Sequence, residues 1–149
     1  MDPAGLDLVT PSPFLSANPR GTDLATALAA LRRVPHFAVY PRDSVPARWH
    51  YTGHPRIPAI VGVMDEGWEL TTRAFASRRP PRVHGGDHGF DNTAPSMGAL
   101  FVAAGPAFRS GAVVEPFRNI HVYDLLCGIL GLRPAPNDGS PDSTRAMRR

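Results

Sequence analysis

Apolar residues recur with helical spacing in two stretches of the chain. In "GTDLATALAALRR" (21–33) they fall at i, i+3, i+4 and i+7, which predicts a helix capped by Thr22 or Asp23. A second stripe, in "NIHVYDLLCGILGL" (119–132), predicts a closing helix that Gly131 ends. The residues of this second stripe are Val122, Leu125, Leu126, Ile129 and Leu130.

Three short apolar runs have the length and composition of strands. "HFAVY" (36–40) is followed by Pro41, which ends it, and "IPAIVGVM" (57–64) is rich in β-branched residues. "ALFVAAG" (99–105) is predicted as another buried strand. The stretch "DEGWELTTRAF" that begins at Asp65 fits either a strand or a turn.

The order of these elements predicts an α/β or α+β piece without internal repeats. We divide the chain into an irregular, proline-rich segment at 1–20, a main portion at 21–140 and a flexible tail at 141–149. Within the main portion, residues 76–97 have the composition of a long loop.

Composition and charge restrict the class of protein. Hydrophobic residues make up 42% of the 149, which is enough to form a core. The net charge is only +3, and the arginine groups at 78–82 and 145–149 lack interleaved aromatic residues, so we expect no nucleic-acid partner.

The single cysteine, Cys127, rules out an intrachain disulfide. No apolar run is long enough to span a bilayer and no secretory signal is recognisable, so the sequence leaves localisation unknown.

The stretch "HGGDHGFDN" (84–92) combines histidines and carboxylates with three glycines. Histidine is a common zinc ligand, and His88 stands between Gly86 and Gly89, which allow a sharp turn that presents its ring. His88 is therefore a candidate metal ligand. The alternative is that His88 is an ordinary polar residue on an exposed loop.

Other candidate residues have simpler interpretations. His84 and His88 are four residues apart, but the two glycines between them disfavour the helix that a helical zinc motif needs. His50 and His54 repeat this spacing with Gly53 between them, so we interpret both as surface residues.

Two further groups lack the arrangement that catalysis requires. The adjacent Asp65 and Glu66 point in different directions and form no acid–base pair, and Cys127 on the closing helix is expected to be a core residue. The sequence contains no G-x-S-x-G, P-loop or G-x-G-x-x-G element, and "GPAFRSG" is only a weak candidate for a phosphate loop.

Three blocks of the chain resemble the type I phosphodiesterase/nucleotide pyrophosphatase family of the alkaline phosphatase superfamily. They are "RWHYTGHPRIPAIVGVMDEGWEL", "GGDHGFDNTAPSMGALFVAAGPAFRSG" and "PFRNIHVYDLLCGILGLRPAPNDGS". The resemblance runs from about residue 36 to 140 and covers the C-terminal portion of the catalytic domain. It implies an α/β fold with a mixed sheet flanked by helices, incomplete in this chain by itself.

The resemblance implies zinc-dependent hydrolysis of phosphodiester or pyrophosphate bonds in nucleotides or related phosphodiesters. In this family a threonine attacks the phosphorus between two zinc ions, and the last zinc ligand is the histidine of "H-G-Y-D-N". That histidine corresponds to His88, while Phe90 replaces the usual tyrosine. The implied substrate is a nucleotide or a small phosphodiester, and family members are often periplasmic, secreted or on the cell surface.

The remaining parts of the family site have no counterpart in this chain. The nucleophilic threonine and the "S-D-H-G-M" ligand block are expected upstream, so His88 is the only metal ligand carried over and no catalytic residue is assigned. We therefore expect a fragment that is inactive alone, with the missing N-terminal part as a candidate partner. The alternative is a non-catalytic metal- or phosphate-binding module, or a decayed gene product.

Overall fold

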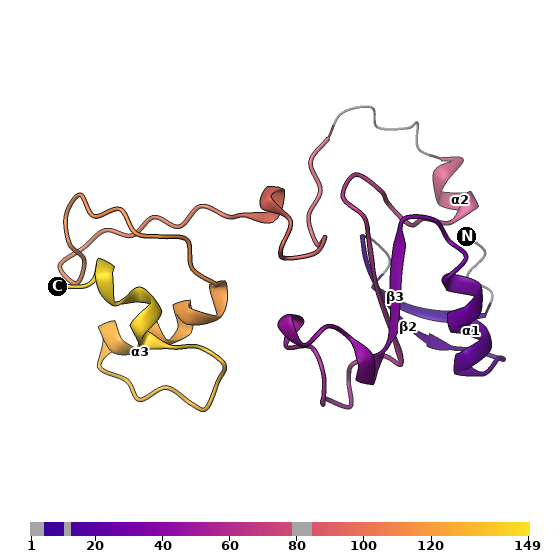
Figure 1. Ribbon diagram of the computed structural model, residues 1–149, viewed down its shortest axis with the longest axis horizontal. Coiled ribbons are helices and arrows are strands. Elements are labelled where there is room, and N and C mark those ends of the chain that lie inside the picture. Colours follow the sequence, from indigo (N-terminus) through magenta and orange to yellow (C-terminus); the bar gives the residue numbers. More distant parts are fainter. Residues whose placement is uncertain (1–4, 11–12, 79–84) are drawn as a thin grey trace. The chain divides into compact units, whose positions relative to one another are not determined.

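The computed structural model describes residues 5–10, 13–78 and 85–149 of the chain. These residues form two compact units, 1–99 and 100–149, which are described separately. Figure 1 shows a twisted sheet with one helix beside it in the first unit, and short helical segments linked by long irregular stretches in the second.

The sheet of the first unit has the strand order β1-β2-β4-β3, and each pair of neighbouring strands is antiparallel. The strands are β1 (Leu6–Thr10), β2 (Phe14–Pro19), β3 (Phe37–Pro41) and β4 (Ile60–Met64). All five residues of β4 are buried, because this strand has a neighbour on each side and both of its faces are covered. β4 is therefore the centre of the unit.

Helix α1 (Leu24–Leu31) covers one face of this sheet. Asp23 caps it, as the sequence predicts, and its Oδ1 accepts a hydrogen bond of 2.9 Å from the backbone N–H of Thr26. The apolar stripe of α1 lies against side chains that alternate along the strands. The buried residues of this face are Leu6, Leu15, Ala17, Ala27, Leu28, Leu31, Phe37, Val39, Ile60, Met64 and Leu70.

The segment between β3 and β4 covers the other face of the sheet. It contains two 3₁₀ turns, η1 (Arg42–Ser44) and η2 (Ala47–Trp49), and it buries Val45 and Ile57 against Val61 of β4. Partly buried aromatic rings complete this second cluster, namely Phe14, Tyr40, Trp49 and Tyr51. Each face of β4 thus has its own layer of side chains.

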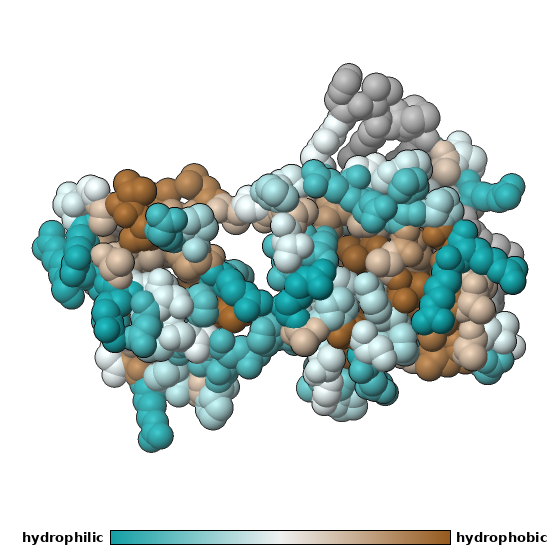
Figure 2. Space-filling model, viewed as in Figure 1, coloured by the Kyte–Doolittle hydropathy of each residue, from teal (hydrophilic) through white to brown (hydrophobic). Residues whose placement is uncertain are grey.

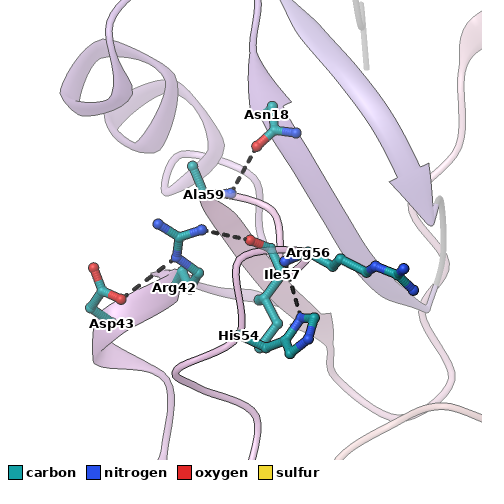
Figure 3. A network of polar contacts seen from close by, with 7 residues as sticks. All are labelled: Asn18, Arg42, Asp43, His54, Arg56, Ile57 and Ala59. Atoms are coloured by element: carbon teal, nitrogen blue, oxygen red, sulfur yellow. Dashed lines mark hydrogen bonds and ion pairs between the residues drawn. The ribbon is translucent and has the colours of Figure 1, made fainter.

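Backbone-directed hydrogen bonds fix the end of this covering segment (Figure 3). The Arg42 guanidinium donates to the carbonyl of Ile57 at 2.9 Å, and the Asn18 side chain accepts from the N–H of Ala59 at 2.9 Å. These contacts satisfy polar groups where the chain enters β4, so the covering segment and the strand are held in one register.

Gly62 allows the closest approach inside the sheet. A Cβ at this position would lie 2.4 Å from Cζ of Phe37 and 3.1 Å from the carbonyl oxygen of Ala38. The Phe37 ring therefore occupies the space that a side chain at position 62 would need.

In the second unit, the loop 134–140 forms two hydrogen bonds with helix α3 (Val122–Leu130) and one with His121, the residue before it. The loop donates from Asn137 Nδ2 to the buried Asp124 at 3.1 Å and from the N–H of Ala135 to Tyr123 Oη at 2.9 Å. The third bond runs from the N–H of Ser140 to His121 Nδ1 at 3.0 Å. These contacts give the "PAPNDG" motif a structural role.

Several sequence predictions agree with the structure. The strands predicted at 36–40 and 57–64 correspond to β3 and β4, although β4 begins only at Ile60. Gly131 ends α3 in the left-handed conformation with φ = 67°, as predicted.

Other predictions were wrong. The segment 1–20, expected to be irregular, contains β1 and β2, because β1 pairs with β2 and β2 pairs with β4, and a proline-rich pattern does not reveal these hydrogen bonds. The resemblance implied part of a mixed sheet; within the described residues every pairing is antiparallel, and the mixed sheet of the complete domain stays a prediction. The segment 99–105 forms no strand there either, and Leu100 and Val102 are exposed.

The remaining differences concern helices. Residues 65–76 form a turn followed by the short α2 (Arg73–Ala76), and the predicted loop 76–97 contains the 3₁₀ turn η3 (Pro95–Met97). On α3, Leu126 and Leu130 of the predicted stripe are exposed, whereas Asp124, Leu125 and Cys127 are buried. The buried Asp124 carboxylate accepts a hydrogen bond from Asn137.

Two 3₁₀ segments complete the second unit. They are η4 (Asn119–His121), directly before α3, and η5 (Pro141–Met147), in which Thr144 and Met147 are buried. The segment predicted to be a flexible tail thus contains η5, and its flexibility stays a prediction. No helix within the described ranges is long and apolar enough to cross a membrane.

Replacing Gly62 with alanine should destabilise the sheet, because the new methyl group would overlap the Phe37 ring at the buried central strand. We expect a loss of about 1–3 kcal/mol in the free energy of unfolding, as in other overpacked cores. Urea denaturation of the full chain, followed by circular dichroism, measures it.

Gly5→Ala is the matched control, since the nearest atom to a Cβ there lies 3.8 Å away and the same amino acids are exchanged. Equal stability of the Gly62→Ala variant and the control would contradict the importance of this contact.

Candidate functional site

The loop 85–92 presents His88 to solvent at the surface of the first unit. The next residue, Gly89, has φ = +99°, a backbone conformation that residues other than glycine rarely adopt. A Cβ on Gly89 would also lie 3.5 Å from Cγ of Pro13. The chain then turns inward, and Phe90 packs against the core under α1. The predicted sharp turn therefore occurs at Gly89. The φ angle of Gly86 is not positive, so this glycine does not adopt the same conformation.

Asp91 anchors the other end of this loop. Its carboxylate forms an ion pair with Arg48, which lies 43 residues earlier in η2. The same carboxylate accepts hydrogen bonds from the N–H of Thr93 at 2.9 Å and from Thr93 Oγ1 at 2.7 Å. His88 is exposed, but three of its neighbours toward the C-terminus are fixed by backbone conformation, apolar packing and charge.

These contacts change the acidity of Asp91. Burial raises the pKa of its carboxyl group, but the two hydrogen bonds from Thr93 and the charge of Arg48 outweigh burial and lower the pKa from 3.8 to about 2. The folded chain consequently holds Asp91 as an anion, and the ion pair with Arg48 persists over the whole physiological pH range.

Two cavities adjoin the loop. One, of about 210 Å³, lies against the second face of the sheet and has aromatic walls. Its lining residues are Phe14, Trp49, Tyr51, Val63 and Gly89 to Asn92. The other, of about 500 Å³, is lined by three acidic residues, Glu66, Glu69 and Asp87, together with Gly67, Gly85, Gly86, Phe90, Ser96 and Met97.

The histidines and cysteine considered in the sequence are distributed as follows. His50 and His54 lie at the end of η2 and in the turn after it, at the surface as predicted, and His84 lies outside the described residues. Cys127 is buried on α3, as expected for a core residue.

The two acidic residues have separate surroundings. Asp65 contacts His36 and Glu66 lines the larger cavity, so they do not act as a pair, in agreement with the sequence prediction.

His36 is a structural residue that sequence reasoning missed. Its Nδ1 lies 3.1 Å from Asp65 Oδ2, and its ring stacks on Trp68 with 3.9 Å between centroids. His36 and Asp65 directly extend the β3–β4 ladder, so the "DEGW" motif closes one end of that hairpin. The role of Arg48 was also missed, because only the fold brings it to Asp91, which lies 43 residues away in the sequence.

The imidazole of His88 suits one ligand position of a zinc site. His88 offers an accessible imidazole, which is a suitable zinc ligand. Across the described ranges, no three His, Cys, Asp or Glu residues are grouped so that they could hold a metal ion. A complete site would need ligands from elsewhere, and no reaction step through a metal follows from these residues alone.

Comparison with known proteins defines the class. The family model described as type I phosphodiesterase / nucleotide pyrophosphatase matches residues 2–91, a range that includes His88. The chain belongs to this family. The match begins well before residue 36, where the recognisable motifs start, and therefore includes β1, β2 and α1.

Individual relatives show how much of the protein is represented. The chain is 38% identical over 115 residues to mouse ectonucleotide pyrophosphatase/phosphodiesterase family member 7, covering 77% of this chain and 25% of the relative. It is 36% identical over 146 residues to bis(5'-adenosyl)-triphosphatase enpp4 of Xenopus laevis, covering 97% of this chain and 31% of the relative. The chain thus spans about a quarter to a third of these relatives.

Solved structures extend the likeness to the fold. Human ectonucleotide pyrophosphatase/phosphodiesterase 5 matches the whole chain with a TM-score of 0.86 and 31% identity, and 39% of that protein is covered. The inactive murine form of the same enzyme, solved in complex with AMP, matches with a TM-score of 0.83 and 30% identity. The structure is therefore a partial fold of this family.

The environment of Asp91 predicts its titration. Its pKa should be about 2 in the folded chain. Because the folded value lies below the unfolded value, Asp91 stabilises the fold fully above about pH 4, and this contribution is lost as the pH falls toward about 2. NMR titration of the side-chain carboxyl carbon measures the pKa directly.

Thr93→Val removes the hydroxyl bond and should raise the pKa of Asp91 toward 3.8. Thr93→Ser, which keeps the hydroxyl group, is the matched control and should leave the pKa near that of the unaltered chain. If both variants titrate like the unaltered chain, the Thr93 hydroxyl does not stabilise the carboxylate.

Proposed function

We propose that this chain is part of a zinc-dependent hydrolase of phosphodiester or pyrophosphate bonds in nucleotides, and that His88 is a ligand of one zinc ion. The observation that supports the role of His88 is its place on a loop held by Gly89, Phe90 and Asp91. A ligand presented in this way loses little conformational entropy on binding a metal. Family membership supports the type of reaction.

The chemical contributions divide between this chain and the rest of the domain. Bound zinc ions would polarise phosphoryl oxygens and activate a nucleophile. This chain contributes the imidazole of His88, and Asp91, which is ionised at physiological pH, keeps the loop in place. The nucleophilic threonine and the other ligands implied by the family belong to residues outside this chain.

The substrate class is inferred from relatives. One is named as a bis(5'-adenosyl)-triphosphatase, and a solved structure of another holds AMP. Both names share an adenosine 5'-phosphate group, which supports a nucleotide containing a phosphodiester or pyrophosphate bond as the proposed substrate class. The isolated 149 residues supply one ligand and should not hydrolyse such a compound alone.

The test is His88→Ala in the longest natural polypeptide that contains this chain. Losing one imidazole should lower zinc content by up to one ion per molecule and reduce hydrolysis of a nucleotide phosphodiester on the order of 100-fold or more. Elemental analysis and a steady-state assay measure the two effects.

His54→Ala is the control, because His54 is an exposed histidine whose Nδ1 accepts a local bond from the N–H of Arg56 at 3.2 Å. It should retain zinc and activity. Full zinc content and unchanged hydrolysis in His88→Ala would show that His88 is not a ligand.

A further inference from the structure

Arg48 connects the loop that carries His88 to a segment far away in the sequence. It lies in η2, on the segment that covers the second face of the sheet, and its guanidinium forms an ion pair with the carboxylate of Asp91. The side chain of Asp91 is only 27% exposed, so water and salt screen this pair less than a fully exposed one. The pair joins the two segments across 43 residues of sequence.

The position of Arg48 is itself determined by aromatic neighbours. Its guanidinium carbon lies 5.7 Å from the centre of the Trp49 ring, a distance at which a cation is attracted to an aromatic face. Trp49 in turn meets Tyr40 of β3 edge to face, with 5.6 Å between ring centroids. Both rings belong to the layer that packs on Val61 of β4. A series of contacts therefore leads from the buried central strand through Arg48 to Asp91.

The loop has an apolar and a charged attachment to the first unit. Figure 2 shows hydrophobic residues at the surface of this unit, drawn at the right, among hydrophilic ones. The packing of Phe90 on the core is non-directional and does not by itself fix the angle at which the loop leaves the core. The bonds from Thr93 to Asp91 span two residues and hold nothing outside the loop.

The charged attachment differs from these two contacts in its geometry. The donors of a guanidinium lie in one rigid plane, so its bond to a carboxylate has a preferred direction. Because Arg48 is held by the aromatic layer, this direction is passed on to Asp91 and to the backbone before it, which includes His88. Loss of the guanidinium should therefore free the loop to take other orientations.

We propose that Arg48 is a positioning residue for the zinc ligand His88 and that it acts through Asp91. This proposal rests on the proposed function, since it requires His88 to bind zinc. In this role Arg48 contacts neither the metal nor the substrate. Its removal should weaken zinc binding and leave the affinity for the nucleotide unchanged.

The order of the loop can be measured in the 149-residue chain without a metal. Arg48→Met keeps an unbranched stem beside Trp49 and removes the charge. We expect the NMR order parameter of the His88 amide to fall from about 0.85 to below about 0.6 in this variant. Arg56→Met is the matched control, because Arg56 is an exposed arginine of the same covering segment, and it should keep the value of the unaltered chain. An equally ordered loop in both variants would overturn the proposal.

Zinc affinity is measured in the longest natural polypeptide that contains this chain. Arg48→Met should bind zinc on the order of tenfold more weakly, as expected when a group that orients a metal ligand is lost. At limiting zinc, kcat should fall while KM for a nucleotide phosphodiester stays constant, and added zinc should restore kcat. Arg48→Lys, which keeps the positive charge, should recover part of the affinity. Zinc affinity of Arg48→Met equal to that of Arg56→Met would overturn the role of Arg48.

A second substitution tests whether Arg48 acts through Asp91, and it replaces the first if Arg48→Met does not fold. Asp91→Asn removes the other charge of the pair and should lower zinc affinity by a similar factor. Because the two residues act as one unit, the double variant should bind zinc about as weakly as either single variant. Losses that multiply in the double variant would show that Arg48 does not act through Asp91.

These outcomes are distinct from a failure of the proposed function. If His88→Ala retains all its zinc, the function is wrong and Arg48 has no ligand to position. If His88→Ala loses zinc while Arg48→Met binds it as tightly as the control, only the positioning role is wrong.

Discussion

Burial of β4 on both faces and along both edges is the constraint on which the first unit depends. The strand pairs with β2 and β3, and its alternating side chains enter two separate apolar layers, one under α1 and one under the β3–β4 segment. Gly62 makes this possible at the centre, because the Phe37 ring lies where a side chain would be. Displacement of β4 would expose both layers together, so the sheet, the helix and the covering segment depend on one another for stability.

The candidate site depends on this core through its anchors. Phe90 reaches the layer under α1, and Asp91 reaches Arg48 on the segment that covers the opposite face. Between an apolar anchor and a charged one, the backbone reverses at Gly89, and His88 stays at the surface. A single exposed histidine is a weak metal ligand in solution. In the proposed zinc site, His88 is held in place by a loop whose geometry the core determines.

The two units of the chain differ in how completely their apolar side chains are buried. Unit 1–99 has a closed core, whereas the 100–149 unit leaves aliphatic side chains of 100–105 in solvent and buries polar contacts around α3. The local hydrogen bonds of the "PAPNDG" loop are complete within the chain. Among the described residues, the segment 100–105 has no neighbouring strand. The chain spans 39% of a solved relative and contains one ligand motif. This agrees with the proposed site, whose other ligands come from other parts of a longer sequence.

The sequence by itself determined the local elements and the class of the protein. The 3.6-residue period and the Asp23 cap define α1, Gly131 ends α3, and the "HGFDN" motif identifies the loop and its candidate ligand, because each of these signals acts over a few residues. Only the tertiary structure decided that residues 1–20 contain two strands, that the described chain offers 100–105 no strand partner, and that Arg48 and Asp91 meet across 43 residues. Those outcomes depend on which segments come together in space, and a proline-rich or apolar stretch has the same local pattern whether or not its partner is present.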